Sequence, residues 1–315
     1  MALRMTQAPP APQHKRPRPK VPVAAALTVV LVLLLVLGLI WGAGGFRKTR
    51  GKTVTLIGST SVEPFAELLA ENFDQGHSDI SVEVQGGGST AGIQALTSGL
   101  ADIGMCSRSL SKEEQQTMTP IVIARDGLAV IVNESNPIDT LTEEQIRSLF
   151  AGDVTNWKQL GGSDSPVNLI MREEGSGTRE AFMNLVMRGR ETALRALVQE
   201  SNGAVKELVR TDPAGVGYMS LGLVGTEVKA VKIKGVEATS ENVRRGTYTL
   251  VRPFLFVVRR RVGEATSQGA AASTRANSPL AAAAGLTPQA KTLIEYVLSP
   301  PGQAVLESQG LVAAQ

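Results

Sequence analysis

Short apolar runs alternate with helical patterns along most of the chain. Residues 53–57 and 80–84 have the length of strands, and apolar residues at helical spacing follow each run. A third short apolar run begins at Asp102 and ends near Ser107. This alternation predicts a βαβαβ arrangement of parallel strands, which is typical of an α/β fold.

The first two predicted strands end in loops that combine glycine with serine or threonine. Residues 58–61 read Gly-Ser-Thr-Ser, and residues 86–90 read Gly-Gly-Gly-Ser-Thr. A helical pattern follows each loop, and Pro64 marks the start of the first helix. Because carboxyl ends of parallel strands meet at one edge of a sheet, and helix N-termini present free N–H groups, these loops predict an anion site.

Residues 171–182, Met-Arg-Glu-Glu-Gly-Ser-Gly-Thr-Arg-Glu-Ala-Phe, repeat this chemistry between another apolar run and another helical pattern. Ser176 and Thr178 add hydroxyl donors, and Arg172 adds a forked guanidinium. The Gly-Lys-Ser/Thr ending of a nucleotide P-loop is missing from this run, which disfavours an ATP site. The alternative is structural: the glycines only form the turn, and Ser176 only caps the helix.

The order of these motifs resembles that of the phosphate-binding proteins of phosphate-specific ABC transporters. The resemblance covers about residues 52–315, and it is carried by residues 58–64, 85–90, 102–108 and 172–179. Further motifs at 214–220, 252–256 and 299–303 are similar to later signatures of that family. The resemblance implies the two-lobed α/β fold of the type II periplasmic binding proteins, with the ligand in the cleft between the lobes.

The resemblance also implies a set of phosphate-binding residues, with Glu174 as the acid that braces Arg172. The expected phosphate-binding residues are Thr60, Ser61, Ser89, Ser107, Arg108, Arg172, Ser176, Gly177 and Thr178. The best-studied relatives have an aspartate after the third strand, which accepts the proton of hydrogen phosphate, where this chain has Ser107 and Arg108. The proton acceptor is therefore open among Ser107, Asp102 and Glu173.

The same fold predicts the division into lobes. Residues 52–128 together with 248–315 are expected to form lobe 1, and residues 129–247 are expected to form lobe 2. Residues 259–286 are rich first in arginine and then in alanine, serine and glycine, which favours a flexible insertion in lobe 1.

The N-terminal region has a different composition. Residues 1–20 are basic and rich in proline, which favours disorder. Residues 21–41 are almost wholly apolar and uncharged, and at 1.5 Å per residue they extend about 30 Å as a helix, enough to cross a bilayer. Because positive residues precede them, we expect a single-pass cell-membrane anchor with the binding domain on the extracytoplasmic, periplasmic side. A cleaved signal peptide is the alternative.

The remaining chemistry argues against several functions. The formal net charge of +3 includes the basic leader, and no basic stripe indicates a nucleic-acid partner. Neither of the two histidines, His14 and His77, lies in a sequence context typical of the catalytic base of a serine hydrolase. No group of His and Cys residues has the spacing of a metal site. We therefore expect neither an enzyme nor a cofactor or metal.

The expected function is capture of inorganic phosphate for the permease subunits of an ABC importer. Two alternatives stay open from the residues alone. One is a binder of another oxyanion, sulfate or molybdate. The other is a sensor that reports phosphate to a membrane partner.

Overall fold

The computed structural model describes residues 52–260 and 286–314. The predicted basic leader at 1–20, the predicted membrane anchor at 21–41 and nearly all of the predicted insertion at 259–286 lie outside these residues. None of the helices in the described part has the length and apolar composition to cross a bilayer. Residues 51–315 form one compact unit, which is described by itself.

Residues 52–106 build a parallel βαβαβ arrangement, as predicted. The strands β1 and β2 pair in parallel, and β1 also pairs in parallel with β3. The elements are β1 (Lys52–Gly58), α2 (Glu63–Asp74), β2 (Ile80–Gly86), α3 (Ser89–Ser98), β3 (Ile103–Cys106) and α4 (Glu114–Thr117).

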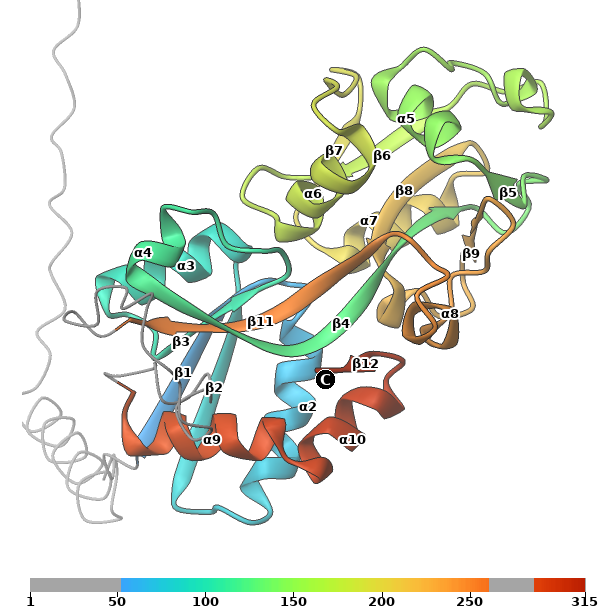
Figure 1. Ribbon diagram of the computed structural model, residues 1–315. Helices are drawn as coiled ribbons and strands as arrows, with labels where there is room; N and C mark the ends of the chain where they lie inside the picture. The colour runs from blue at the N-terminus through green and yellow to red at the C-terminus, as the bar shows by residue number, and fades with distance from the viewer. Residues whose placement is uncertain (1–51, 261–285, 315) are drawn as a thin grey trace, which may run out of the picture. The chain divides into compact units, whose positions relative to one another are not determined.

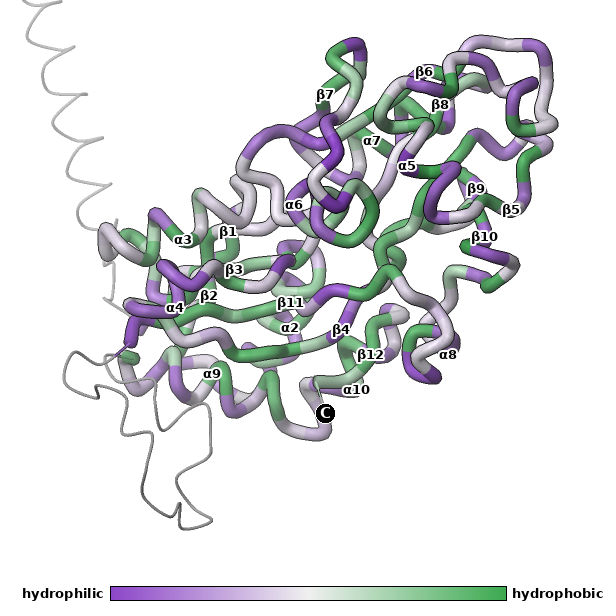
Figure 2. The backbone as a smooth tube through the Cα atoms, turned by 45° about the horizontal axis from the view of Figure 1, so that its top comes forward, coloured by the Kyte–Doolittle hydropathy of each residue, from purple (hydrophilic) through white to green (hydrophobic). Residues whose placement is uncertain are grey.

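Two long strands continue the sheet into a second region. These are β4 (Met118–Val132) and β11 (Val251–Arg259), which pair antiparallel with each other. The sheet follows the order β2-β1-β3-β11-β4-β8-β6-β7, so β4 and β11 stand between the two groups of strands (Figure 1). Figure 2 shows both as largely hydrophobic strands, in keeping with their mostly buried residues.

The second group of strands lies beyond β4 in the sheet. There β8 pairs antiparallel with β4 and parallel with β6, and β6 pairs in parallel with the edge strand β7. The elements are β5 (Thr140–Leu141), α5 (Glu143–Ala151), η1 (Trp157–Leu160), β6 (Asn168–Arg172), α6 (Gly177–Phe182), η2 (Met183–Met187), β7 (Leu197–Gln199), α7 (Asn202–Thr211), β8 (Gly215–Ser220), η3 (Leu221–Leu223), β9 (Lys229–Ala230), β10 (Lys232–Ile233) and α8 (Ser240–Arg244).

Separate hydrophobic cores define two lobes. Lobe 1 contains β1–β3, α2–α4 and the C-terminal helices α9 (Pro288–Leu298) and α10 (Pro300–Ser308). The last strand, β12 (Val312–Ala313), pairs with β4 and places Val312 in the core of lobe 2. The main core of lobe 1 joins α2 and α9 to one face of the sheet, and a smaller core joins α3 to the other face. Lobe 2 contains α5 to α8 with their strands, and β4 and β11 connect the two lobes.

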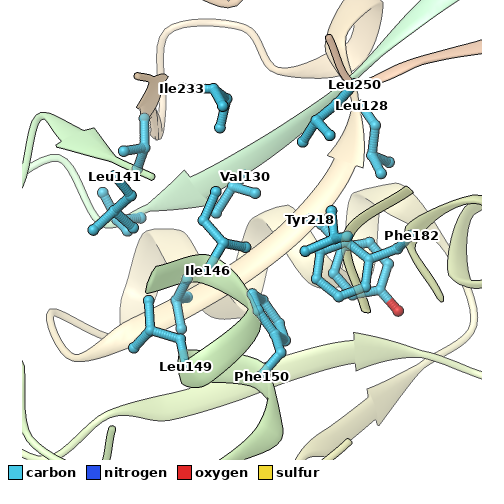
Figure 3. Close-up of a cluster of buried hydrophobic side chains, with 14 of the residues drawn as sticks. Leu128, Val130, Leu141, Ile146, Leu149, Phe150, Phe182, Tyr218, Ile233 and Leu250 are labelled. Atoms are coloured by element: carbon cyan, nitrogen blue, oxygen red, sulfur yellow. The ribbon is translucent and has the colours of Figure 1, made fainter. Parts of the chain in front are cut away.

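The sheet of lobe 2 is covered on both faces because successive residues of β4 point to opposite sides. Val130 belongs to the core under α5, and Ile131 belongs to the core under α7. In the α5 core Phe182 stacks on Tyr218 with ring centroids 4.0 Å apart, and Phe150 meets both rings edge-on (Figure 3).

Helix α3 ends before the next large apolar residue of its segment. Its last residue is Ser98, and Leu100 is 73% exposed. Gly99 adopts a left-handed conformation with φ of 78°, which ends the helix and turns the chain away.

The aromatic cluster of lobe 2 gives a stability prediction. Phe182 is completely buried, so Phe182→Ala should lower the free energy of unfolding by about 3–5 kcal/mol. Leu194→Ala is the control, because Leu194 is fully exposed and its truncation removes no packing. Denaturant unfolding followed by circular dichroism measures both, and equal stability of the two variants would contradict the packing role of Phe182.

Candidate functional site

The hydroxyl-bearing loops lie at the carboxyl ends of their strands, as predicted. Residues 59–62 join β1 to α2, Ser89 is the first residue of α3, and Ser107 follows β3. From lobe 2, Gly177 begins α6 shortly after β6. These segments bring free helix N–H groups to the same region, which favours negative charge.

Hydroxyl groups from these loops form a buried hydrogen-bonded set, here called the hydroxyl cluster, whose members are Ser59, Ser61, Ser89, Ser107 and Thr178. Ser59 Oγ donates to Ser107 Oγ at 2.8 Å, and the Ser107 amide donates to Ser89 Oγ at 3.1 Å. Ser61 Oγ and Thr178 Oγ1 share a bond of 2.6 Å between the lobes. Each member is at most 2% exposed, so these hydroxyls depend on one another or on a ligand for partners.

Arg172 is the charged centre of the site in lobe 2, and its side chain is 1% exposed. Its Nη2 donates to Thr60 Oγ1 in lobe 1 at 3.0 Å, and its Nη1 donates to Thr178 Oγ1 at 3.5 Å. The carbonyls of Gln199 and Glu200 accept further bonds at 3.2 and 3.1 Å. A guanidinium with this many fixed partners is held in one orientation.

The brace of Arg172 is a different acid from the one expected. Glu173 accepts from Arg172 Nε at 2.9 Å and from Nη2 at 3.0 Å, whereas Glu174 is exposed. The expectation for Glu174 is therefore corrected to Glu173. The chain turns at Gly175, with φ of 85°, and this turn leaves Glu173 beside the guanidinium.

Tyr218 of β8 stabilises the backbone at Arg172. Tyr218 hydroxyl accepts the Arg172 amide at 3.3 Å, and burial raises the pKa of Tyr218 to about 12. The hydroxyl therefore stays protonated at physiological pH. It also ties the end of β6 to β8.

Arg252 is a second buried guanidinium that sequence reasoning missed as a site residue. Its Nη1 donates to Thr178 Oγ1 at 2.8 Å. Its Nε donates to Asp126 Oδ2 at 3.0 Å, and Ser220 Oγ donates to Asp126 Oδ1 at 2.9 Å. Arg252 and Asp126 are cross-strand partners on β11 and β4, where these strands pass between the lobes.

Burial acts on both members of this pair. It raises the pKa of Asp126 and lowers the pKa of Arg252, and in each case the partner's charge opposes the shift. The signal in the sequence was a pair of charges of opposite sign, Asp126 and Arg252, within two largely apolar strands. Such residues are rarely buried unless they are paired.

Asn202 is another residue that the sequence did not reveal. Its amide donates to Ser61 Oγ at 2.9 Å, and its Oδ1 accepts the Ser220 amide at 3.1 Å. Asn202 is the first residue of α7, whose N-cap is Ser201. The signal was weak, because asparagine near a helix start is common for structural reasons alone.

Arg108 does not point to the hydroxyl cluster as expected. Its Nη1 and Nη2 donate to the Glu114 carboxylate at 2.7 and 2.8 Å, and Nη1 also donates to the Ser109 carbonyl. Glu180 of α6 contacts its Nε. Asp102 is also remote from the site, because it precedes β3, and its carboxylate accepts the Thr55 amide.

The remaining predicted residues lie where α6 begins. Ser176 is the N-cap and accepts the Arg179 amide at 3.3 Å, so its hydroxyl has a structural role. Gly177 faces lobe 1: a Cβ at this position would stand 2.1 Å from Ser89 Oγ and 2.6 Å from Ser107 Oγ. The Thr90 amide also donates to the Gly175 carbonyl at 3.1 Å. The two lobes are therefore in contact across the site.

The fold and this arrangement define the class of protein. Residues 47–301 match the family model of the PBP superfamily domain, so the chain belongs to that superfamily of two-lobed binding proteins.

Within the superfamily the chain belongs to the phosphate-binding proteins. Phosphate-binding protein PstS of Bacillus subtilis is 30% identical over 66% of this chain and 70% of its own length. A structure of a phosphate ABC transporter substrate-binding protein from Clostridium perfringens, with bound phosphate, has 37% identity and a TM-score of 0.74, and the match covers 84% of this chain and all of that chain. An ABC-type phosphate transport receptor from Vibrio cholerae has 36% identity and a TM-score of 0.63, over 82% of this chain and 99% of its own.

Proposed function

We propose that this protein captures inorganic phosphate between its two lobes and delivers it to the permease subunits of an ABC importer. The observation that carries the proposal is the convergence on Thr178 Oγ1 of two buried guanidinium groups, Arg172 and Arg252, and of the Ser61 hydroxyl from lobe 1. Family membership supports phosphate as the anion.

The proposed phosphate ligands come from both lobes. Lobe 1 supplies hydroxyls and N–H groups, and lobe 2 supplies Arg172 and the start of α6. The set is Thr60, Ser61, Ser89, Ser107, Arg172, Gly177 and Thr178, to which we add Arg252. Residues 52–128 with 248–315 act as lobe 1 of this proposal, and residues 129–247 act as lobe 2.

We also propose that the binding domain is tethered on the extracytoplasmic side of the cell membrane. The uncharged apolar stretch at 21–41, with basic residues before it, supports a single membrane-spanning helix. Alkaline washing of membranes tests this, because an anchored chain stays in the membrane fraction and a chain cleaved near residue 44 is released.

Selectivity for phosphate rests on hydrogen bonding rather than on net charge. Each guanidinium of the site already has a carboxylate partner, Glu173 or Asp126, so these four groups carry no net charge. Hydroxyl groups accept hydrogen bonds as well as donate them, and they can therefore accept a hydrogen bond from the P–OH group of hydrogen phosphate. A hydroxyl whose own proton is already donated to another partner can only accept from the ligand, and sulfate, which has no proton near neutral pH, leaves it unpaired.

Calorimetry of the full chain in detergent tests the function directly. We expect phosphate to bind, and we expect sulfate and molybdate to compete poorly even in large excess. If sulfate binds as tightly as phosphate, the protein is a binder of oxyanions in general and not of phosphate in particular. No binding of any of the three anions would reject the proposal.

Arg172 is expected to be essential for binding. Arg172→Ala leaves Glu173 without its buried partner and should weaken phosphate binding by about 3–5 kcal/mol, or roughly 10²–10⁴-fold. Arg172→Lys should also lose at least about tenfold, because an ammonium cannot serve Thr60, Thr178 and Glu173 together. Arg210→Ala, on an exposed face of lobe 2, is the control and should bind normally. Normal affinity in Arg172→Ala would place the site elsewhere.

Gly177 is expected to limit how closely the lobes approach. The methyl group of Gly177→Ala would clash with Ser89 Oγ only when the lobes are closed. Phosphate affinity should therefore fall by roughly tenfold or more, while thermal stability without phosphate stays unchanged. Small-angle scattering should show that the decrease in radius of gyration with phosphate is smaller than in the wild type. Full closure and unchanged affinity in this variant would contradict the proposed site.

A further inference from the structure

Arg108 is held rigidly within lobe 1. The Glu114 carboxylate accepts hydrogen bonds from both terminal nitrogens of Arg108, and it also accepts the Ser111 amide at 2.8 Å. The side chain of Arg108 is only 6% exposed. Because these partners all belong to lobe 1, Arg108 keeps this orientation whether or not lobe 2 is close.

The remaining nitrogen of Arg108 meets lobe 2. Its Nε is buried and makes no hydrogen bond of regular geometry, and the Glu180 carboxylate contacts it as an ion-pair partner. Glu180 lies three positions after Gly177, and Arg108 directly follows Ser107. The same two segments therefore make both contacts, Ser107 with Gly177 at the hydroxyl cluster and Arg108 with Glu180 beside it.

Burial and two neighbouring charges act on the Glu180 carboxylate. Burial raises the pKa of Glu180, and the nearby Glu114 carboxylate raises it further, while Arg108 opposes the shift. The Arg108 guanidinium stays charged, and its buried Nε–H needs an acceptor once water is excluded. An oxygen atom satisfies this need whether or not it carries a charge.

We propose that Glu180 is a positioning residue: it places an oxygen against the buried Nε of Arg108 across the lobes, holds the closed state together, and so sets how slowly phosphate leaves. It touches no ligand itself. When the lobes open, Arg108 Nε and Glu180 both face water and lose nothing, so the contact favours the closed state alone. This inference rests on the proposed function.

Dissociation kinetics of the full chain test the acceptor role. Glu180→Met removes the oxygen but keeps the length of the side chain, and it should speed phosphate release by roughly tenfold while the association rate stays within about twofold of the wild type. Glu180→Gln keeps a carbonyl oxygen and should release phosphate within about twofold of the wild-type rate. Glu207→Met is the matched control, because Glu207 pairs with Arg210 on its own helix in lobe 2. It should release phosphate at the wild-type rate.

Hydrogen exchange at the Thr90 amide tests the same idea without ligand. Thr90 lies in the first turn of α3, where amides have no partner within the helix, and its N–H donates to Gly175 of lobe 2. In phosphate-free protein this amide should exchange faster in Glu180→Met than in the wild type, and thermal unfolding should be the same in both.

The outcomes separate the two proposals. A wild-type protein that binds no phosphate rejects the proposed function, while Thr90 exchange still decides the role of Glu180. Wild-type release and wild-type exchange in Glu180→Met overturn the inference. Equal acceleration in Glu180→Gln and Glu180→Met also overturns it, since charge would then matter rather than an acceptor.

Discussion

The Thr178 hydroxyl is the point at which both lobes and the strands between them satisfy one another's buried polar groups. Ser61 Oγ of lobe 1 lies 2.6 Å from it, and Arg252 Nη1 of β11 lies 2.8 Å from it. Arg172 approaches it from lobe 2. A buried hydroxyl or guanidinium without partners costs free energy, so this closed arrangement depends on all of these groups being present together. An anion that takes over these bonds stabilises the same closed state.

The strands that connect the lobes carry part of this network themselves. Asp126 and Arg252 stand opposite each other on β4 and β11, and both side chains are buried. A buried ion pair contributes little net stability, because the loss of hydration offsets the attraction between the charges. Its position gives it another role: it holds the Arg252 guanidinium against Thr178 from the strands that connect the lobes. One pair of residues therefore joins the hydroxyl cluster to the connecting strands.

Burial also explains which charges meet at Thr178 and which do not. Arg172 and Arg252 each have one carboxylate partner and still donate to Thr178. Arg108 lies between two carboxylates, Glu114 and Glu180, which pair with its charge beside the hydroxyl cluster. An arginine next to a binding loop is thus an anion ligand or a contact between lobes, depending on which carboxylates the fold brings near it.

The local order of the chain could be predicted from the sequence because its causes are local. Apolar period, glycine-rich turns and Pro64 predicted β1, α2, β2 and α3, and they placed the hydroxyl loops at strand ends, where the structure has them. The motifs predicted the family, which the comparisons confirm. The resemblance implied Thr60, Ser61, Ser89, Ser107 and Thr178 as ligand residues, and their short polar side chains in loops at strand ends are visible in the sequence.

Only the tertiary structure decided the partners of the charged residues. Glu173 rather than Glu174 braces Arg172, because the turn at Gly175 fixes which carboxylate faces the guanidinium. Arg108 pairs with an acid on α6, far along the chain, and Arg252 reaches the site from a strand near the end of the chain. The sequence by itself determined the strands, the loops and the kind of anion chemistry. Which charges meet depends on distances between segments remote in the chain, and no local pattern encodes those distances.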